Sequence, residues 1–391
     1  IWNSMDIHFL PAWMAMIYTK CVENKAKIIN FCFYSYYALL IIAKSYGYNS
    51  GDFFYKICFY VGAVLLLIKL FNTRYTFREY ALLLIFLGIV GIIYLKLGDL
   101  TALLLLITVS GMKECNFLTV IKMTAIIRLL TLTGQLLMVG IGIIDVQRQL
   151  ADPSDVNSRV LYELGWNKPN SAFLSAFLTV VVIMYLYYDK LNIWHLLLTS
   201  VPMIILFRLT YCRTGMILFL GLWVLIFLDK VTKNKKYYKV FCLSYAGAFL
   251  LSYLSVRYYQ STSEVSKVLN HLFSGRIDIM KTYYSTVGLS LFPRDISVFS
   301  FYSNRIIDNL YMSITITSGI LSGILFVFLL TKLMFWLYKN MFYKEIIFMV
   351  IFAAYAMLEQ FPLNPSMNPF ILLLAVLLYG NKVMIGEKKI E

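Results

Sequence analysis

Charged residues are scarce in this chain. Only 14% of its 391 residues are charged, whereas a soluble domain carries about a quarter. Hydrophobic residues make up 60%, and they gather in apolar runs long enough to cross a bilayer. Continuous runs, rather than alternation of apolar and polar residues, favour helices over a membrane barrel. The sequence therefore predicts an all-α, polytopic integral membrane protein that forms a single domain over residues 1–391.

Sequence signals for several kinds of catalytic site are missing. The chain has no phosphate-binding loop with its lysine and no HExxH zinc motif. The six cysteines are scattered without metal-ligand spacing, and the three histidines lie far apart. No DxD pair, which would hold a metal-bound sugar nucleotide, occurs in the two longest polar segments, residues 145–168 and 255–309. We therefore expect no metal and no cofactor, and an enzyme of this kind would act on a substrate that arrives already activated.

The apolar runs predict a bundle of about 12–14 transmembrane helices. Our interpretation has thirteen spans. They are expected near residues 5–19, 28–44, 53–71, 80–96, 99–112, 119–144, 169–187, 193–211, 214–228, 240–254, 310–337, 346–360 and 368–380.

The positions of the lysines predict the orientation. A net charge of +15 would suggest a nucleic acid partner in a soluble protein, but here it reflects topology and no nucleic acid is expected. Segment 229–239, "DKVTKNKKYYK", has five lysines, and segment 20–27 and the C-terminal tail have three each. Lysine and arginine mark cytoplasmic loops, which places these segments and the C-terminus inside. Residues 145–168 and 255–309 then form two outer loops, each expected to carry short helices, and the turn 212–214 is also outside.

The arginines, unlike the lysines, are not concentrated in the expected cytoplasmic segments. Its rigid, always-charged fork binds phosphate with two hydrogen bonds. Arg213 lies in the tight turn "CRTG" and has no acidic neighbour. This position favours a ligand-binding role for Arg213. Arg128 falls within an expected span, where a charged side chain needs a partner that the sequence does not identify. Seven of the eleven arginines fall in the expected outer segments: Arg148, Arg159, Arg213, Arg257, Arg276, Arg294 and Arg305.

Five short motifs follow one another in the second half of the chain. They are "SRVLYELGWNKPN" (158–170), "CRTG" (212–215), "SGR" (274–276), "IDNLY" (307–311) and "YAMLEQFPLNPSMNPFILLLA" (355–375). In this order, in a polytopic protein with two outer loops, they resemble the Wzy-type polysaccharide polymerases of the O-antigen ligase and polymerase superfamily. The resemblance covers residues 155 to 375.

This resemblance implies a GT-C-like architecture and a metal-independent glycosyltransferase. Such a polymerase transfers a growing glycan of capsule, exopolysaccharide or O-antigen type from undecaprenyl diphosphate to a lipid-linked repeat unit. The reaction takes place at the outer face of a bacterial cytoplasmic membrane. The expected partners are the undecaprenyl-diphosphate-linked oligosaccharide, the lipid bilayer, and flippase and chain-length regulator proteins.

The resemblance also implies which residues bind substrate. Arg159, Arg213 and Arg276 match the family motifs and are expected to converge on a lipid diphosphate. Arg208 either joins them or extends along its own span to the membrane surface. Asn170 is expected to contact sugar or phosphate, with helix capping as the alternative, and Asn309 belongs to the same set.

Two carboxylates are candidates for catalysis. In related ligases a His-Asn pair occupies the place of Asp308-Asn309, so Asp308 resembles the general base that takes the proton of the acceptor hydroxyl. Its alternative role is to cap the helix expected at 310–337. Glu359 matches the late glutamate of the family, and it either acts in catalysis or pairs with an arginine and orients it.

Two other functions stay open. A ligase of the same superfamily would transfer finished polymer to another acceptor. The related ligases have histidine where this chain has Asp308, which favours a polymerase over a ligase. A lipid-linked oligosaccharide flippase or transporter would show two similar halves, and the sequence shows no such repeat.

Overall fold

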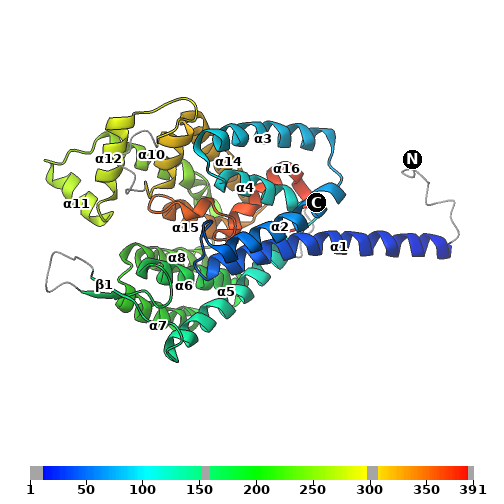
Figure 1. Ribbon diagram of the computed structural model, residues 1–391, viewed down its shortest axis with the longest axis horizontal. Helices are drawn as coiled ribbons and strands as arrows, with labels where there is room; N and C mark the ends of the chain where they lie inside the picture. Colours follow the sequence, from blue (N-terminus) through cyan, green and yellow to red (C-terminus); the bar gives the residue numbers. More distant parts are fainter. Residues whose placement is uncertain (1–11, 151–158, 297–306, 386–391) are drawn as a thin grey trace.

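The computed structural model describes residues 12–150, 159–296 and 307–385, and nearly all of its regular structure is helical (Figure 1). The helices are α1 (Ala12–Ser45), α2 (Phe53–Asn72), α3 (Phe77–Leu97), α4 (Thr101–Gly111), α5 (Phe117–Gly140), α6 (Pro169–Leu186), α7 (Ile193–Thr210), α8 (Arg213–Val231), α9 (Tyr238–Phe241), α10 (Ser244–Arg257), α11 (Glu264–Leu272), α12 (Arg276–Val287), α13 (Leu310–Ser313), α14 (Ile320–Lys339), α15 (Tyr343–Tyr355) and α16 (Ala375–Tyr379).

Eight of the described helices are long and apolar enough to cross a membrane, and a bent pair that includes α10 makes a ninth. This confirms the helical, multi-pass interpretation, but the number is lower than the 12–14 expected. Where spans were expected at 99–112 and 346–360, α4 has 11 residues and α15 has 13. The run at 368–380 forms the 3-10 helix Pro369–Leu374 followed by α16. Helices buried within a bundle are apolar all round, so hydropathy does not separate them from spans.

The first helix replaces two expected spans. Helix α1 continues without a break through the lysine-rich segment 20–27, which was expected to be a loop. That segment has no glycine or proline, and its alanine, glutamate and lysines favour helix. Residues 12–19 therefore extend the same helix, and residues 5–11 of the expected first span lie outside the described residues.

Among the described residues, short helices occur in only one of the two expected outer loops. Segment 255–309 carries α11 and α12, whereas segment 145–168 forms the antiparallel strands β1 (Arg148–Leu150) and β2 (Val160–Tyr162). Valine and tyrosine favour a strand over a short helix, which explains the difference at β2. Parts of both loops, residues 151–158 and 297–306 with Arg305, lie outside the described residues.

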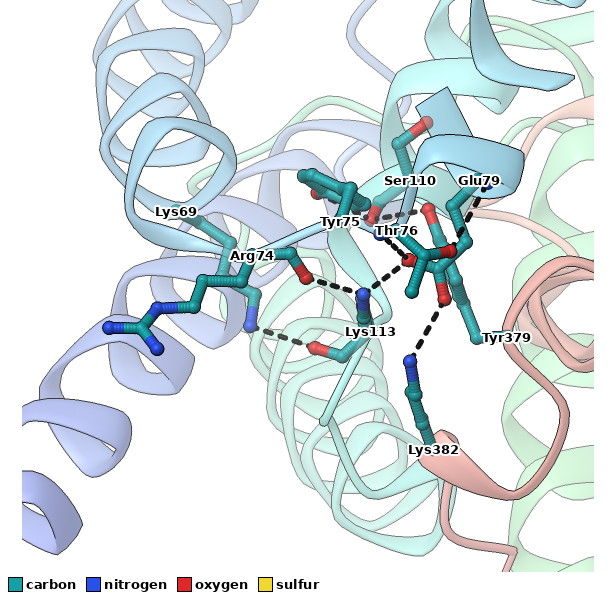
Figure 2. A network of polar contacts seen from close by, with 9 residues as sticks. All are labelled: Lys69, Arg74, Tyr75, Thr76, Glu79, Ser110, Lys113, Tyr379 and Lys382. Atoms are coloured by element: carbon teal, nitrogen blue, oxygen red, sulfur yellow. Dashed lines mark hydrogen bonds and ion pairs between the residues drawn. The ribbon is translucent and has the colours of Figure 1, made fainter. Parts of the chain in front are cut away.

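The loops are sorted between two ends of the bundle. In Figure 1, β1, α11 and α12 lie at the left, and the start of α1 lies at the opposite end. Trp166 Nε1 donates to the Ser45 carbonyl at 3.1 Å, which joins the end of α1 to a segment that was expected outside. At the other end, Lys113 and Lys382 both pair with Glu79 (Figure 2). Lys382 belongs to the C-terminal tail that was expected inside, so Glu79 and Lys113 lie at the same end of the bundle as this tail.

Two departures from regular helix occur in the last third of the chain. The span expected at 310–337 is broken, because a π-helical turn over Ile314–Ser318 and Gly319 separate α13 from α14. Gly319 has φ +91°, and a Cβ there would lie 2.6 Å from the Leu291 carbonyl oxygen, so only glycine allows this approach. After α15, residues 356–368 run largely without α-helix inside the bundle, and the Pro365 carbonyl accepts a hydrogen bond from Tyr37. Such bonds satisfy polar backbone at membrane depth.

Candidate functional site

One arginine holds both candidate catalytic carboxylates. Arg276 is the first residue of α12, and its Nε lies 2.8 Å from Asp308 Oδ2 while its Nη2 lies 2.6 Å from Glu359 Oε1. The "SGR" motif makes this possible, because Ser274 and Gly275 both adopt positive φ and so turn the chain into α12. The Arg276 side chain is 12% exposed, against 33% for Asp308 and 28% for Glu359. The two acids therefore remain accessible while the arginine between them is nearly buried.

The three groups together carry a net negative charge. Burial raises the pKa of Glu359, and the attraction of Arg276 offsets this only in part. Burial also lowers the pKa of Arg276, but Glu359 and Asp308 together raise it by more, so the guanidinium stays charged. One cation facing two carboxylates is a poor binding group for a further anion.

Arg159 and Arg213 share a single aromatic ring. Their guanidinium carbons lie 4.4 Å and 5.7 Å from the centre of the Tyr211 ring. Tyr211 ends α7 in the left-handed conformation, with φ +52°, and Arg213 begins α8 directly after Cys212. No ion pair within the described part of the chain involves either arginine. Two adjacent cations beside the positive end of a helix favour an anion.

The "CRTG" motif also fixes where α8 begins. A Cβ on Gly215 would lie 2.5 Å from Cε1 of Phe173 on α6. Glycine at this position therefore lets the start of α8 pack against α6. The turn lies one residue earlier than expected, at Tyr211 and Cys212, and Arg213 is the first helical residue.

The turn that precedes Arg213 lies near the carboxylates. Cys212, between Tyr211 and Arg213, is within electrostatic range of both Glu359 and Arg276. Lys168, the residue before α6, interacts in the same way with Glu359. The site thus gathers charged side chains from the residues just before β2 and α6, from the first residues of α8 and α12, and from the segments before α13 and after α15. Residues that are scattered over the sequence meet at one end of the bundle.

Two of the expected binding residues are less central. Asn170 lies at the margin of this group, and Arg208 lies away from it. Asn170 is exposed in the first turn of α6, two residues after Lys168. Arg208 is exposed in the last turn of α7, in line with the exposed apolar residues Val201, Ile204 and Ile205. This is the position of a side chain that extends from a lipid-facing surface to the headgroups. The structure therefore does not join Arg208 to the arginine pair.

Asn309 is an internal residue. Its side chain accepts the Met312 N–H at 3.0 Å, and its Nδ2 donates to Ser252 Oγ at 2.8 Å and to the Met357 carbonyl at 2.9 Å. The residue is only 2% exposed, so the expectation of substrate contact is not supported. It is also Asn309, not Asp308, that caps the helix. Asp308 is left available for other roles.

Sequence reasoning missed Tyr211 and Lys168. Both neighbour motif residues, so an aromatic beside "CRTG" and a lysine within "GWNKPN" were the available signals. Within residues 12–150, 159–296 and 307–385, no group of three or more His, Cys, Asp or Glu side chains is arranged to hold a metal ion. The charged side chains described at this site are guanidinium, ammonium and carboxylate groups.

The geometry can be set against known proteins. Comparison with family models, with curated proteins and with solved structures finds no match to this chain.

Proposed function

We propose that this protein is a metal-independent glycosyltransferase of the Wzy-type polysaccharide polymerases. It would transfer a growing glycan from undecaprenyl diphosphate to a lipid-linked repeat unit at the outer face of the bacterial cytoplasmic membrane. The observation that carries this proposal is the meeting of two kinds of group at one end of the bundle. Arg159, Arg213 and Lys168 are cations without carboxylate ion pairs among the described residues, and Asp308 and Glu359 are carboxylates held by one arginine.

In this mechanism the arginine pair binds the leaving group. The acceptor hydroxyl attacks the anomeric carbon of the growing chain, and the bond from that carbon to the diphosphate oxygen breaks. Negative charge then increases on the diphosphate, where Arg159 and Arg213 stabilise it without a metal. Lys168 contributes a third positive charge at the entrance to α6.

The carboxylates act on the acceptor. Asp308 is the more exposed of the two and takes the proton of the attacking hydroxyl as general base. Glu359 holds the guanidinium of Arg276, which in turn fixes Asp308. Arg276 is therefore assigned as a positioning residue, because its charge is already met by two carboxylates and it is not a free phosphate ligand. The proposal also includes a GT-C-like fold, with the site on the outer face of the membrane and the C-terminus in the cytoplasm.

The test is a deletion strain combined with reconstitution. Loss of the gene should leave single repeat units on the lipid carrier and abolish long polysaccharide. Purified protein in liposomes should lengthen lipid-linked repeats, and a chelator should not stop it. Failure to lengthen them, or dependence on a divalent metal, would count against the proposal. Long polymer that accumulates without reaching its final acceptor would instead identify a ligase.

A flippase or transporter of lipid-linked oligosaccharides is the second candidate. One observation favours it: α14 is preceded by the break at Gly319, and residues 356–368 interrupt the helices inside the bundle. Broken helices of this kind occur at transporter sites. In the deletion strain, repeat units that stay on the inner leaflet would support transport rather than polymerisation.

A further inference from the structure

A buried arginine lies outside the site described above. Arg128 is near the middle of α5 and only 2% exposed. Its Nη2 donates to the Ser366 carbonyl at 2.6 Å, but its Nε has no hydrogen-bond partner among the described residues. No carboxylate in that part of the chain forms an ion pair with it. A buried guanidinium without a counter-ion is costly, so a ligand that supplies negative charge would stabilise it.

Arg128 lines a cavity of about 260 Å³ whose charged walls are all positive. Lys44 and Lys168 are the other charged residues of the lining, and no acidic residue of the described chain lines it. Two acids interact with these lysines, Asp52 with Lys44 and Glu359 with Lys168. A second polar side chain of the wall, Ser175, has a buried hydroxyl without a partner among the described residues. Cations and a free hydroxyl suit a phosphate.

An apolar groove adjoins the cavity. It has a volume of about 530 Å³ and is lined by residues of α3, α4 and α14 with the segment after α15. Lys44, Asn49 and Met367 line both spaces, so the two lie side by side. Elsewhere the groove is mainly apolar, with residues such as Phe86, Leu105 and Leu378. An anionic end and an apolar channel together match a molecule with a charged head and a long hydrocarbon tail.

We propose that this site binds a lipid with a phosphate headgroup and one long hydrocarbon tail. The phosphate lies at Arg128 between Lys44 and Lys168, and the tail lies in the groove between α3 and α14. The inference deepens the proposed function and rests on it for one point, that the tail is polyprenyl. The site would then hold the carrier of one of the two glycans while Arg159 and Arg213 hold the other. No bond forms or breaks at Arg128.

Photolabelling in nanodiscs tests the proposal. The probe is a polyprenyl phosphate with a photoreactive group on its tail, and the matching uncharged polyprenol is its comparison. The full chain should be labelled on peptides of α3, α4 and α14 at least tenfold more by the phosphate than by the alcohol. Bilayer-facing residues meet both probes equally, so the difference reports the groove.

Three variants locate the binding. Arg128→Met and Ala102→Phe, which remove the cation and fill the groove, should each lower the phosphate-dependent labelling at least tenfold. Lys122→Met is the matched control, because Lys122 is exposed on the same helix, and it should label like the wild type. Lys168→Gln removes a cation from the mouth without opening the bundle. It keeps the test decisive if Arg128→Met fails to fold, and it should lower the labelling several-fold.

Several results would overturn the inference. Equal labelling by phosphate and alcohol would exclude a headgroup site, and unchanged labelling in Arg128→Met or Ala102→Phe would exclude this location. Binding of inorganic phosphate that needs Arg128, without tail labelling, would show a site for free phosphate instead. Labelling that depends on Arg128 in a protein that does not polymerise would leave this site standing and reject the proposed function. Polymerisation by a protein without such labelling would do the reverse.

Discussion

Arg276 Nη2 lies 2.6 Å from Glu359 Oε1, although 83 positions separate the two residues. The contact ties the start of α12 to the segment after α15, and Arg276 Nε at the same time holds Asp308. Both contacts come from one planar group with two separate donors, a geometry that a lysine ammonium cannot reproduce.

Arg276→Lys should therefore lose activity nearly as fully as Arg276→Gln. Lysine keeps the charge but reaches one carboxylate at a time, so Asp308 is no longer fixed. We expect a loss of about a hundredfold in polymerisation rate, comparable to the loss of one oriented donor at a reacting centre. The measurement is the rate of lengthening of lipid-linked repeats by purified protein.

The control is Arg257→Lys, an exposed arginine at the end of α10, which should keep wild-type activity. Arg276→Lys that is well folded and fully active would show that the charge alone suffices.

The pair that shares Tyr211 predicts a second pattern. Arg213→Ala and Arg213→Lys should both lower the rate about a hundredfold, because a point charge does not bind phosphate bidentately. Tyr211→Asn keeps a residue that tolerates positive φ but removes the ring, and should cost only about fivefold, the scale of one exposed cation–π contact. Activity and membrane abundance are measured together, with Arg257→Ala as control. Full activity of Arg213→Ala at normal abundance would reject the arginine pair as the diphosphate site.

Substitution of Asn309 is expected to lower stability and to leave activity nearly unchanged. Asn309→Ala removes a helix cap and leaves the buried Ser252 hydroxyl and Met357 carbonyl short of a donor. A loss of about 2 kcal/mol in the free energy of unfolding is expected. Asn309→Asp keeps the cap but not the donors, and should lie between the wild type and Asn309→Ala. Activity per folded molecule should change little in either variant, and a large specific loss with unchanged stability would return Asn309 to the substrate site.

The sequence predicted helices where apolar runs are long, and failed where they are short or interrupted by charge. The runs at 99–112 and 346–360 are as apolar as a span, but α4 and α15 are too short to cross on their own. The lysines of segment 20–27 predicted a loop, whereas helix propensity kept α1 continuous. Local composition does not tell whether a run faces lipid or protein, because both surroundings are apolar.

For the site, the motifs identified residues but not their partners. Arg276 meets Asp308 and Glu359, and Arg159 and Arg213 share the Tyr211 ring, yet which carboxylate meets which arginine depends on where the fold places the start of α12. Asn309 looked like a site residue because it follows Asp308, and only its backbone direction turns it inward. Arg128 was visible as a charge in a span, but its cavity is built by four distant segments.

The raised pKa of Glu359 predicts how stability changes with pH. The folded state binds this proton more tightly than the unfolded chain does, since a free glutamate titrates at about 4.3 and burial raises the value. Protonation therefore stabilises the folded protein, and this contribution is lost as the pH rises through the folded pKa. Glu359→Gln does not titrate, so the melting temperature of the wild type relative to this variant should fall as the pH rises above the range in which a free glutamate titrates.

Thermal melts of both proteins in detergent measure this difference. Glu264→Gln, whose carboxylate is 83% exposed on α11, should show no such trend. A difference that rises with pH would mean that the pairing with Arg276 outweighs burial.

The buried pair at the opposite end predicts coupled stability losses. The side chains of Lys113 and Glu79 are 2% and 6% exposed, and Lys113 also donates to the Arg74 carbonyl (Figure 2). Removing one partner leaves the other charge buried, which typically costs about 3–5 kcal/mol. Glu79→Gln and Lys113→Met should each lower the free energy of unfolding by about this amount in denaturant titrations.

The double variant separates pairing from packing. With both charges gone, neither is left uncompensated, so Glu79→Gln with Lys113→Met should lose clearly less than the sum of the single losses, by about 1–3 kcal/mol. Lys382, the second cation on Glu79 at 3.2 Å, is 47% exposed and can turn to water in the double variant. The exposed pair of Glu264 and Lys267 on α11 serves as the control, and its coupling should stay below about 1 kcal/mol. Losses at Glu79 and Lys113 that simply add would show that the two charges are stabilised independently, by water or backbone, and not by each other.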